Sequence, residues 1–281
     1  MFIIRSRLHT VALVTAWQGA IMGNEMPQGH LEHSSDESYI IVKAAPRPSQ
    51  KYGETVCIAG LNSDGTWVRL YPVLFVYLNE PQKFSRWDKV AYRWSQPKDV
   101  RTESRRVDPN SIQIVGKLPK GEITTFLNRS VVTSLVRERE LGRSLALIRP
   151  EIMDFWHEPK SVADIAEQEK VQEQLRSQLD MFAHKDAIPA KACPHAFKYR
   201  YRDDDGLHVG TCQDWETETT FFRRRSETDE AAALDWMIQK FGVEFPAKGM
   251  ALAMGTHRRW QDQWLINGVI RLDEEKQANL F

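Results

Sequence analysis

Alternating apolar and polar positions in the first half of the chain predict a series of short β-strands. We expect strands at residues 39–44 and 54–61, because both segments are rich in β-branched residues. Residues 62–65 (Asn-Ser-Asp-Gly) indicate a tight turn in which Gly65 takes a positive φ angle, so residues 66–70 would return as the second strand of a hairpin. Two further strands are expected at residues 88–94 and 111–115. Short strands separated by turns are typical of a small barrel or a sandwich.

From Ile123 onward the periodicity becomes helical. We expect helices at residues 130–141 and 162–182. Ser161 can cap the second of these, with Asp164 three residues further on. The β-rich region is therefore expected to pass into a helical connection.

A second unit with both strands and helices follows a proline-bracketed linker. The pattern predicts a hairpin around residues 203–206, a helix from Asp214 to about Arg225, a helix at about 228–241, and a closing hairpin that pairs 250–255 with 264–272. The predicted fold class is α+β, with an N-terminal small β-barrel unit, a helical connection, and a C-terminal α+β unit of two hairpins and two helices. The expected domains are a leader at 1–38, a β unit at 39–122, the connection at 123–188, and a candidate catalytic unit at 189–281.

Composition and charge limit the classes of function. The 281 residues are 42% hydrophobic and 27% charged, which suits a soluble protein with a substantial core. The formal net charge is zero, so no long-range field draws the whole molecule onto nucleic acid, although local basic patches can still bind phosphate. Three cysteines provide no paired disulfide framework, which favours a reducing cytoplasm. No stretch is long and apolar enough to span a bilayer.

The beginning of the chain allows two interpretations. Residues 1–26 resemble a weak signal peptide, with Arg5 and Arg7 before an apolar stretch. An upstream start codon, with Met22 or Met26 as the true beginning, accounts for the same residues, and we prefer that interpretation.

Carboxylates in the C-terminal unit are the first candidates for chemistry. Asp214 and Glu216 flank Trp215 where a strand passes into a helix, and a carboxylate pair there can position water or stabilise a developing cation. His208 lies on the preceding strand and is the candidate auxiliary group. A simpler interpretation is that Asp214 caps the helix, Glu216 complements its positive end, and Asp203–Asp205 form a solvated turn.

Arginine and aromatic residues provide candidate nucleic-acid contacts, because aromatic rings stack on bases and arginines bind phosphates. Each group also has an ordinary structural explanation, as a half-covered sheet face or a solvated turn. The candidates are Trp67, Arg69, Arg105, Arg106 and Trp215, together with His257, Arg258, Arg259 and Trp260 at the tip of the closing hairpin.

Metal and nucleotide signatures are weak. Cys193, His195, His208 and Cys212 are residue types that bind zinc, but their spacing matches no familiar structural site, so we expect no metal and no cofactor. The sequence contains no Walker loop, GxGxxG, GxSxG or HExxH motif, which argues against nucleotide-driven motors, Rossmann dehydrogenases and the easily recognised hydrolases.

Several strings resemble a family of prokaryotic proteins with an OB-like N-terminal β module. These strings are CIAGLNSDGTWVRLYPVLF, DVRTESRRVDPNSIQIV, SLALIRP, FKYRYRDDDG with DWE, and LAMGTHRRWQDQWLINGVI. The resemblance covers most of residues 39–272 and implies an association with mobile-element and phage-defence genes, and therefore nucleic acid as the object of the function. It brings no catalytic assignment.

Two classes of function follow as hypotheses. The first is a cytoplasmic DNA glycosylase-like hydrolase that flips out and excises a base, with Asp214 and Glu216 as the acids and His208 or His257 as the auxiliary group. The alternative is a non-catalytic module that recognises foreign DNA or RNA, and a metal-dependent nuclease ranks third. The expected partner is double- or single-stranded DNA, with no membrane and no obligate protein partner.

Overall fold

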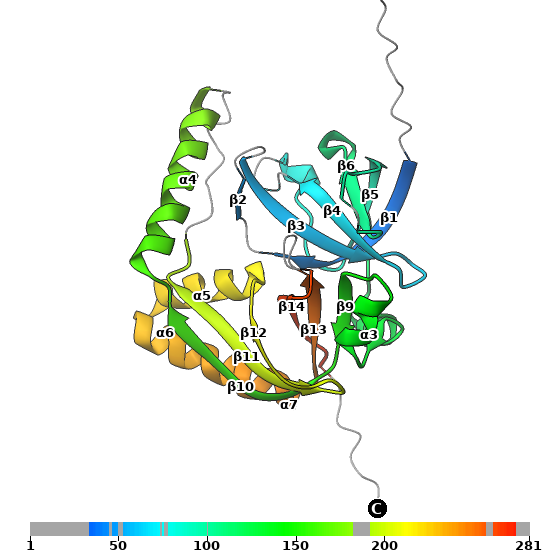
Figure 1. Ribbon diagram of the computed structural model, residues 1–281. Helices are drawn as coiled ribbons and strands as arrows, with labels where there is room; N and C mark the ends of the chain where they lie inside the picture. The colour runs from blue at the N-terminus through cyan, green and yellow to red at the C-terminus, as the bar shows by residue number, and fades with distance from the viewer. Residues whose placement is uncertain are drawn as a thin grey trace, which may run out of the picture. The chain divides into compact units, whose positions relative to one another are not determined.

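The protein has a mixed α+β architecture (Figure 1). The computed structural model describes residues 34–44, 47–49, 53–73, 75, 78–99, 101–181, 192–256 and 261–273. None of the described helices combines the length and the apolar composition that crossing a bilayer requires. The interpretation of residues 1–26, and the hairpin tip His257–Trp260, lie outside the described residues.

Five strands of the N-terminal part close into a barrel. They are β1 (Ser34–Lys43), β3 (Gly53–Leu61), β4 (Trp67–Val73), β5 (Asp88–Ser95) and β6 (Ser104–Val107). Strand β1 pairs with both β3 and β5, while β6 lies between β4 and β5 and runs parallel to β4. Numbered within the barrel, the strand order is 1-2-3-5-4 with strands 3 and 5 parallel, which is the OB-fold arrangement. The predicted α+β class with an OB-like N-terminal barrel is confirmed.

The barrel strands follow the apolar pattern of the sequence. Gly65 has a φ of 87° in the predicted turn between β3 and β4. Residues 34–38, assigned from the sequence to the leader, instead begin β1, because they pair with β5 and the buried Ser38 hydroxyl shares a 2.8 Å hydrogen bond with Tyr92. Two additional strands extend the sheet, namely β2 (Arg47–Ser49) on β3 and β7 (Gln113–Lys117) on β5. Short 3₁₀ segments occupy Glu80–Gln82, Pro109–Ser111 and Lys120–Glu122.

A four-stranded sheet is buried on both faces. Its order is β14 (Trp264–Arg271), β13 (Met250–Thr256), β9 (Leu145–Ile148) and β8 (Val131–Val132). Leu145 and Leu147 pack with Ile41 and Trp67 from the outer side of the barrel. The alternate residues of β9 belong to the core on the other face of the sheet. Figure 1 shows β13 and β14 between the barrel strands and the remaining sheet.

The remaining sheet consists of β10 (Glu151–Pro159), β11 (His195–Asp203) and β12 (Gly206–Thr211) in that order. Helices α5 (Trp215–Glu227) and α6 (Glu230–Met237) contribute Phe221 and Met237 to its core. A π-helical turn at Ile238–Glu244 and α7 (Phe245–Ala247) continue from α6, so the helix expected at 228–241 is interrupted. Both predicted hairpins are present, β11–β12 in this sheet and β13–β14 in the four-stranded sheet.

The sequence predicted a helical connection at residues 123–188, but its described part, residues 123–181, also contains strands. It contains α2 (Ile123–Asn128), α3 (Leu135–Glu140) and α4 (Val162–Met181), and also the strands β8, β9 and β10. Ser161 and Asp164 cap α4 as predicted, with 3.1 Å from the Asp164 amide to the Ser161 hydroxyl. The strands were missed because a short apolar run such as that of β9 lacks alternation when both faces are buried.

Candidate functional site

Asp214 is the most completely bonded of the predicted catalytic residues. Its side chain is 1% exposed and its backbone forms a β-bridge with Ala44. As the N-cap of α5, it accepts hydrogen bonds from the Glu216 amide at 3.4 Å and the Thr217 hydroxyl at 3.2 Å. It also accepts from the Val269 amide of β14 at 3.3 Å. The carboxylate therefore joins the barrel, α5 and β14, which agrees with the capping interpretation.

Arg86 links this carboxylate to the second predicted acid. One of its terminal nitrogens donates to Asp214 at 3.0 Å and lies 3.3 Å from Glu216, while the other donates to the Val269 carbonyl at 2.7 Å. The Arg86 side chain is 10% exposed, whereas that of Glu216 is 44% exposed. Of the predicted acid pair, only Glu216 presents a carboxylate to solvent.

Trp215 forms an aromatic pair beside these charges. Its ring meets that of Phe75 edge-on at 5.3 Å between centroids. The Lys43 ammonium lies 5.1 Å from the centroid of Phe75 and 5.6 Å from that of Trp215. Burial lowers the pKa of Lys43, and Arg86 adds to this effect, although Glu216 among other carboxylates opposes it. We call Lys43, Phe75, Arg86, Asp214, Trp215 and Glu216 the junction site.

His208 lies away from the junction site. Its Nε2 is 2.8 Å from Asp203 Oδ1, and its ring stacks on Tyr201 with centroids 5.2 Å apart. His208 is on β12, and Asp214 follows beyond the end of that strand. Six residues of near-extended chain span about 20 Å, so the structure does not bring the three predicted catalytic residues together.

The Asp203–Asp205 turn is more than the solvated turn expected from the sequence. The Asp203 side chain is 4% exposed, and Asp204 alone of the three is classed as exposed. Asp205 accepts from the Ser134 hydroxyl at 2.7 Å and from the Val136 amide at 3.0 Å, at the beginning of α3. Partial desolvation acts to raise the pKa of Asp205, but these hydrogen bonds outweigh it and hold the pKa below its ordinary value.

Trp67 and Arg69, two predicted nucleic-acid contacts, are buried between the barrel and the β14–β13–β9–β8 sheet. Arg69 donates to the Ser144 carbonyl at 3.0 Å and hydroxyl at 2.9 Å, and Ser144 in turn donates from its amide to Glu103 at 2.6 Å. Burial lowers the pKa of Arg69 to about 10. Neither side chain faces a ligand, because the outer face of β4 is used for internal packing.

Arg105 and Arg106 remain at the surface of β6. The Arg105 guanidinium stacks on Trp94 at 4.2 Å from the ring centroid and donates to the carbonyls of Thr102 and Ser104. Arg106 is exposed, as is Lys98 in the connection between β5 and β6. Among the described residues, these three cations form no ion pair with a carboxylate.

The residues considered for zinc are dispersed. His195 Nε2 is 3.0 Å from Glu230, whereas His208 pairs with Asp203. Cys193 and Cys212 are buried in the core, and burial raises the pKa of the Cys212 thiol well above its ordinary value. Within the described ranges, no group of three or more His, Cys, Asp or Glu residues is placed to hold a metal ion.

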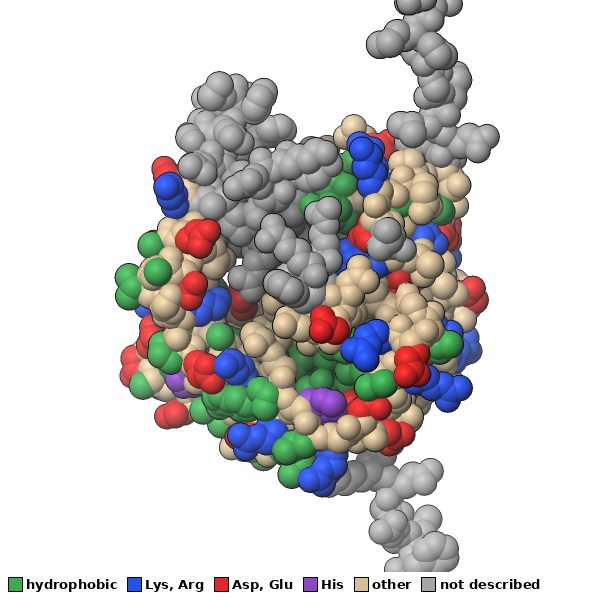
Figure 2. All heavy atoms as spheres, viewed as in Figure 1, with side chains coloured by type: hydrophobic (Ala, Val, Ile, Leu, Met, Phe, Trp, Pro, Cys, Tyr) green, Lys and Arg blue, Asp and Glu red, His purple; other side chains and the backbone are tan. Residues whose placement is uncertain are grey.

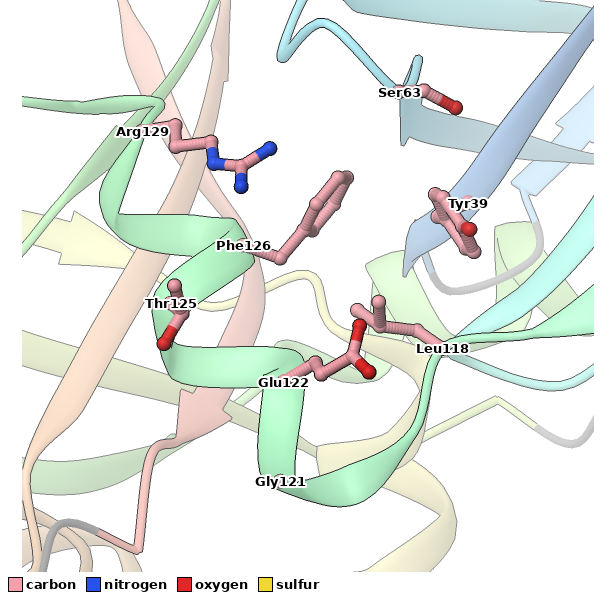
Figure 3. A pocket seen from close by; sticks show the side chains of 8 residues that line it. All are labelled: Tyr39, Ser63, Leu118, Gly121, Glu122, Thr125, Phe126 and Arg129. Atoms are coloured by element: carbon pink, nitrogen blue, oxygen red, sulfur yellow. The ribbon is translucent and has the colours of Figure 1, made fainter.

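Two surface pockets lie elsewhere on the barrel. One, of about 300 Å³, lies between β1 and α2, and Figure 3 shows the Phe126 ring between Tyr39 and Arg129. The other, of about 580 Å³, lies along β1 and β5. None of the predicted site residues lines either pocket.

Comparison with known proteins identifies the family. Residues 35–130 match a domain of unknown function (DUF8758), and residues 129–281 match a second one (DUF8757). The second match covers more than half of the chain, so the protein belongs to the family described as domain of unknown function DUF8757. No curated protein matches.

Similarity to solved structures is low. The Ifi202 HINa domain in complex with 20-bp dsDNA is 11% identical with a TM-score of 0.32, covering 86% of this chain and 95% of its own. A chain from a structure described as the molecular basis for abrogation of activation of pro-inflammatory cytokines is 11% identical with a TM-score of 0.28, covering 64% and 75%. Likeness at this level does not define the fold, which rests on the strand order of the barrel itself.

Proposed function

We propose that this protein binds nucleic acid at the β5–β6 end of its barrel. The observation that carries the proposal is a set of three cations on β6 and in the connection before it, namely Lys98, Arg105 and Arg106, of which Arg105 stacks on Trp94. Because no described carboxylate neutralises these cations, they are available to phosphate oxygens. We call these four residues the basic cluster.

The location of the basic cluster agrees with the topology. OB-folds bind oligonucleotides through the face of barrel strands 2 and 3 and through the loops after strands 1 and 4. In this chain the outer face of β4 carries the buried Trp67 and Arg69. The connection between β5 and β6 is the loop after strand 4, and it holds Lys98. Figure 2 shows charges of both signs interspersed over the face in view, so a small cluster, and not the whole surface, would provide the contacts.

Binding can be measured by fluorescence anisotropy with labelled single-stranded DNA, double-stranded DNA and single-stranded RNA. We expect the affinity to decrease as the salt concentration rises from about 50 to about 200 mM. The slope of log affinity against log salt concentration should become shallower by about 0.7–0.9 for each phosphate contact removed. Arg106→Ala and Lys98→Ala should weaken binding, whereas Arg139→Ala, at an exposed position on α3, serves as the matched control. Equal affinity of all three variants would refute the assignment of the basic cluster.

Base excision is the second candidate function, and the junction site favours it. Glu216 is a half-exposed carboxylate that directly follows Trp215, a partly exposed residue whose ring packs on the buried Phe75. A carboxylate close to an aromatic side chain is a combination that hydrolysis of a flipped nucleotide can use. In this proposal Glu216 orients water or stabilises the sugar cation, and Asp214 holds the helix that carries Glu216.

The test of excision uses plain and modified DNA with EDTA present, followed by alkali. Strand breaks that appear only after alkali report abasic sites, and Glu216→Gln should abolish them while Glu227→Gln, at the other end of α5, leaves them unchanged. Breaks that need magnesium and no alkali would indicate a nuclease instead. Binding without any product would leave the non-catalytic module as the function for the substrates tried.

A further inference from the structure

We propose that Lys43 is a reactive amine that forms a Schiff base with an aldehyde carbon, and that the ring-opened sugar of an abasic nucleotide is its substrate class. The inference rests on the excision function proposed for the junction site. It assigns to that site a strand-cleaving step after base removal, which carboxylates alone do not supply.

The Lys43 nitrogen has no polar partner within the part of the chain that the structure describes. Among the described residues, the ammonium donates to no carboxylate or carbonyl within hydrogen-bond distance and contacts the rings of Phe75 and Trp215. Lys89 provides a comparison on the same barrel. Its ammonium also lies over a ring, 5.8 Å from the centroid of Tyr39, but it is bonded to Glu37 at 2.5 Å.

The two lysines differ in electrostatics for the same reason. The hydrogen bond to Glu37 raises the pKa of Lys89, whereas burial and the neighbouring Arg86 lower the pKa of Lys43. Burial and a nearby cation are the two means by which proteins keep a lysine amine neutral and nucleophilic. The negative charge of Glu216 favours protonated Lys43, but Arg86 also pairs with Glu216 and partly neutralises that charge.

The chemistry balances without an oxidant or a metal. The Lys43 lone pair attacks the C1′ aldehyde carbon, and uptake of one proton from solvent with loss of one water gives the protonated imine. Glu216 removes a proton from C2′, the C–H electrons form a C=C bond conjugated with the imine, and the C3′–O bond breaks so that the 3′-phosphate departs. Addition of water to the imine then releases the sugar aldehyde and restores the amine.

The experiment uses DNA with a preformed abasic site, so its outcome does not depend on base excision. With cyanoborohydride present, the imine is reduced to a stable amine, and we expect a covalent protein–DNA complex whose peptide map places the sugar on Lys43. Lys43→Arg keeps the positive charge but cannot form the imine, so it should lose the complex; Lys89→Ala should retain it.

A second measurement separates failure of the amine from failure of DNA binding. Reductive methylation of the whole protein with formaldehyde and cyanoborohydride near neutral pH should label Lys43 faster than Lys89. Slower labelling of Lys43, or an unchanged covalent complex with Lys43→Arg, would overturn the proposal. Lys43 could be labelled preferentially and trapped on preformed abasic DNA while no intact DNA loses a base. That result would uphold the reactive amine and refute the proposed glycosylase step.

Discussion

Arg86 and Asp214 lie on either side of the boundary between the barrel and α5, with 3.0 Å between the guanidinium and the carboxylate. Both side chains are nearly inaccessible, at 10% and 1% exposure. The pair therefore links two segments that are 128 positions apart in the sequence. We therefore expect this pair to contribute to the stability of the fold.

We predict that Asp214→Ala lowers the free energy of unfolding by about 3–5 kcal/mol, because it leaves the buried Arg86 charge without its partner. Urea denaturation followed by circular dichroism measures the change. Asp204→Ala, at the exposed turn position, should stay within about 0.5 kcal/mol of the original protein. If Asp214→Ala were fully stable and yet inactive on DNA, Asp214 would regain the catalytic role expected from the sequence.

Replacing Arg69 should lower the stability of the protein much more than replacing Arg106. Arg69→Met removes two buried hydrogen bonds to Ser144 and the positive charge that interacts with Glu103, so we expect a loss of about 1–3 kcal/mol of stability. Arg106→Ala should change stability by less than about 0.5 kcal/mol. Thermal melts of both variants, measured beside their DNA affinity, check the prediction. A DNA-binding defect in stable Arg69→Met protein would contradict the buried role.

Acid should weaken the contact between the Asp203–Asp205 turn and α3. The pKa of Asp205 is depressed in the folded protein, so its stabilisation is complete above the ordinary value of about 3.9 and is lost as pH falls through the folded pKa. Asp205→Asn should remove this part of the pH dependence. Urea denaturation midpoints of the original protein and of Asp205→Asn, measured at several pH values below about 5, should converge as the pH falls. Parallel curves would mean that Asp205 contributes nothing to acid sensitivity.

Gly60 allows the strands β1 and β3 to approach closely. A β-carbon at this position would lie 2.7 Å from the backbone oxygen of Tyr39, which cannot move without disturbing the barrel. We predict that Gly60→Ala costs about 1–3 kcal/mol of stability through overpacking. Gly121→Ala is the matched control, because a β-carbon there meets no atom within 4 Å. Equal melting temperatures for the two variants would contradict the prediction.

The sequence determined the local elements. Alternation and β-branched residues predicted β3, β4 and β5 to within a few residues, although β1 begins five residues earlier than predicted, and Gly65 marked the hairpin turn. The capping pattern of Asp214 and the two C-terminal hairpins were also readable, because each depends on residues that are neighbours in the chain. These features need no distant partner to define them.

The tertiary structure decided which of these residues are accessible and which meet. The residue pattern around Trp67 and Arg69 is compatible with a partly exposed strand face, but the sheet formed by residues 131–271 covers both side chains. Lys43, Phe75 and Arg86 show no local signal that would join them to Glu216, because strand pairing and core packing alone bring them together. Burial and charge pairing are properties of the folded chain, and local periodicity does not contain them.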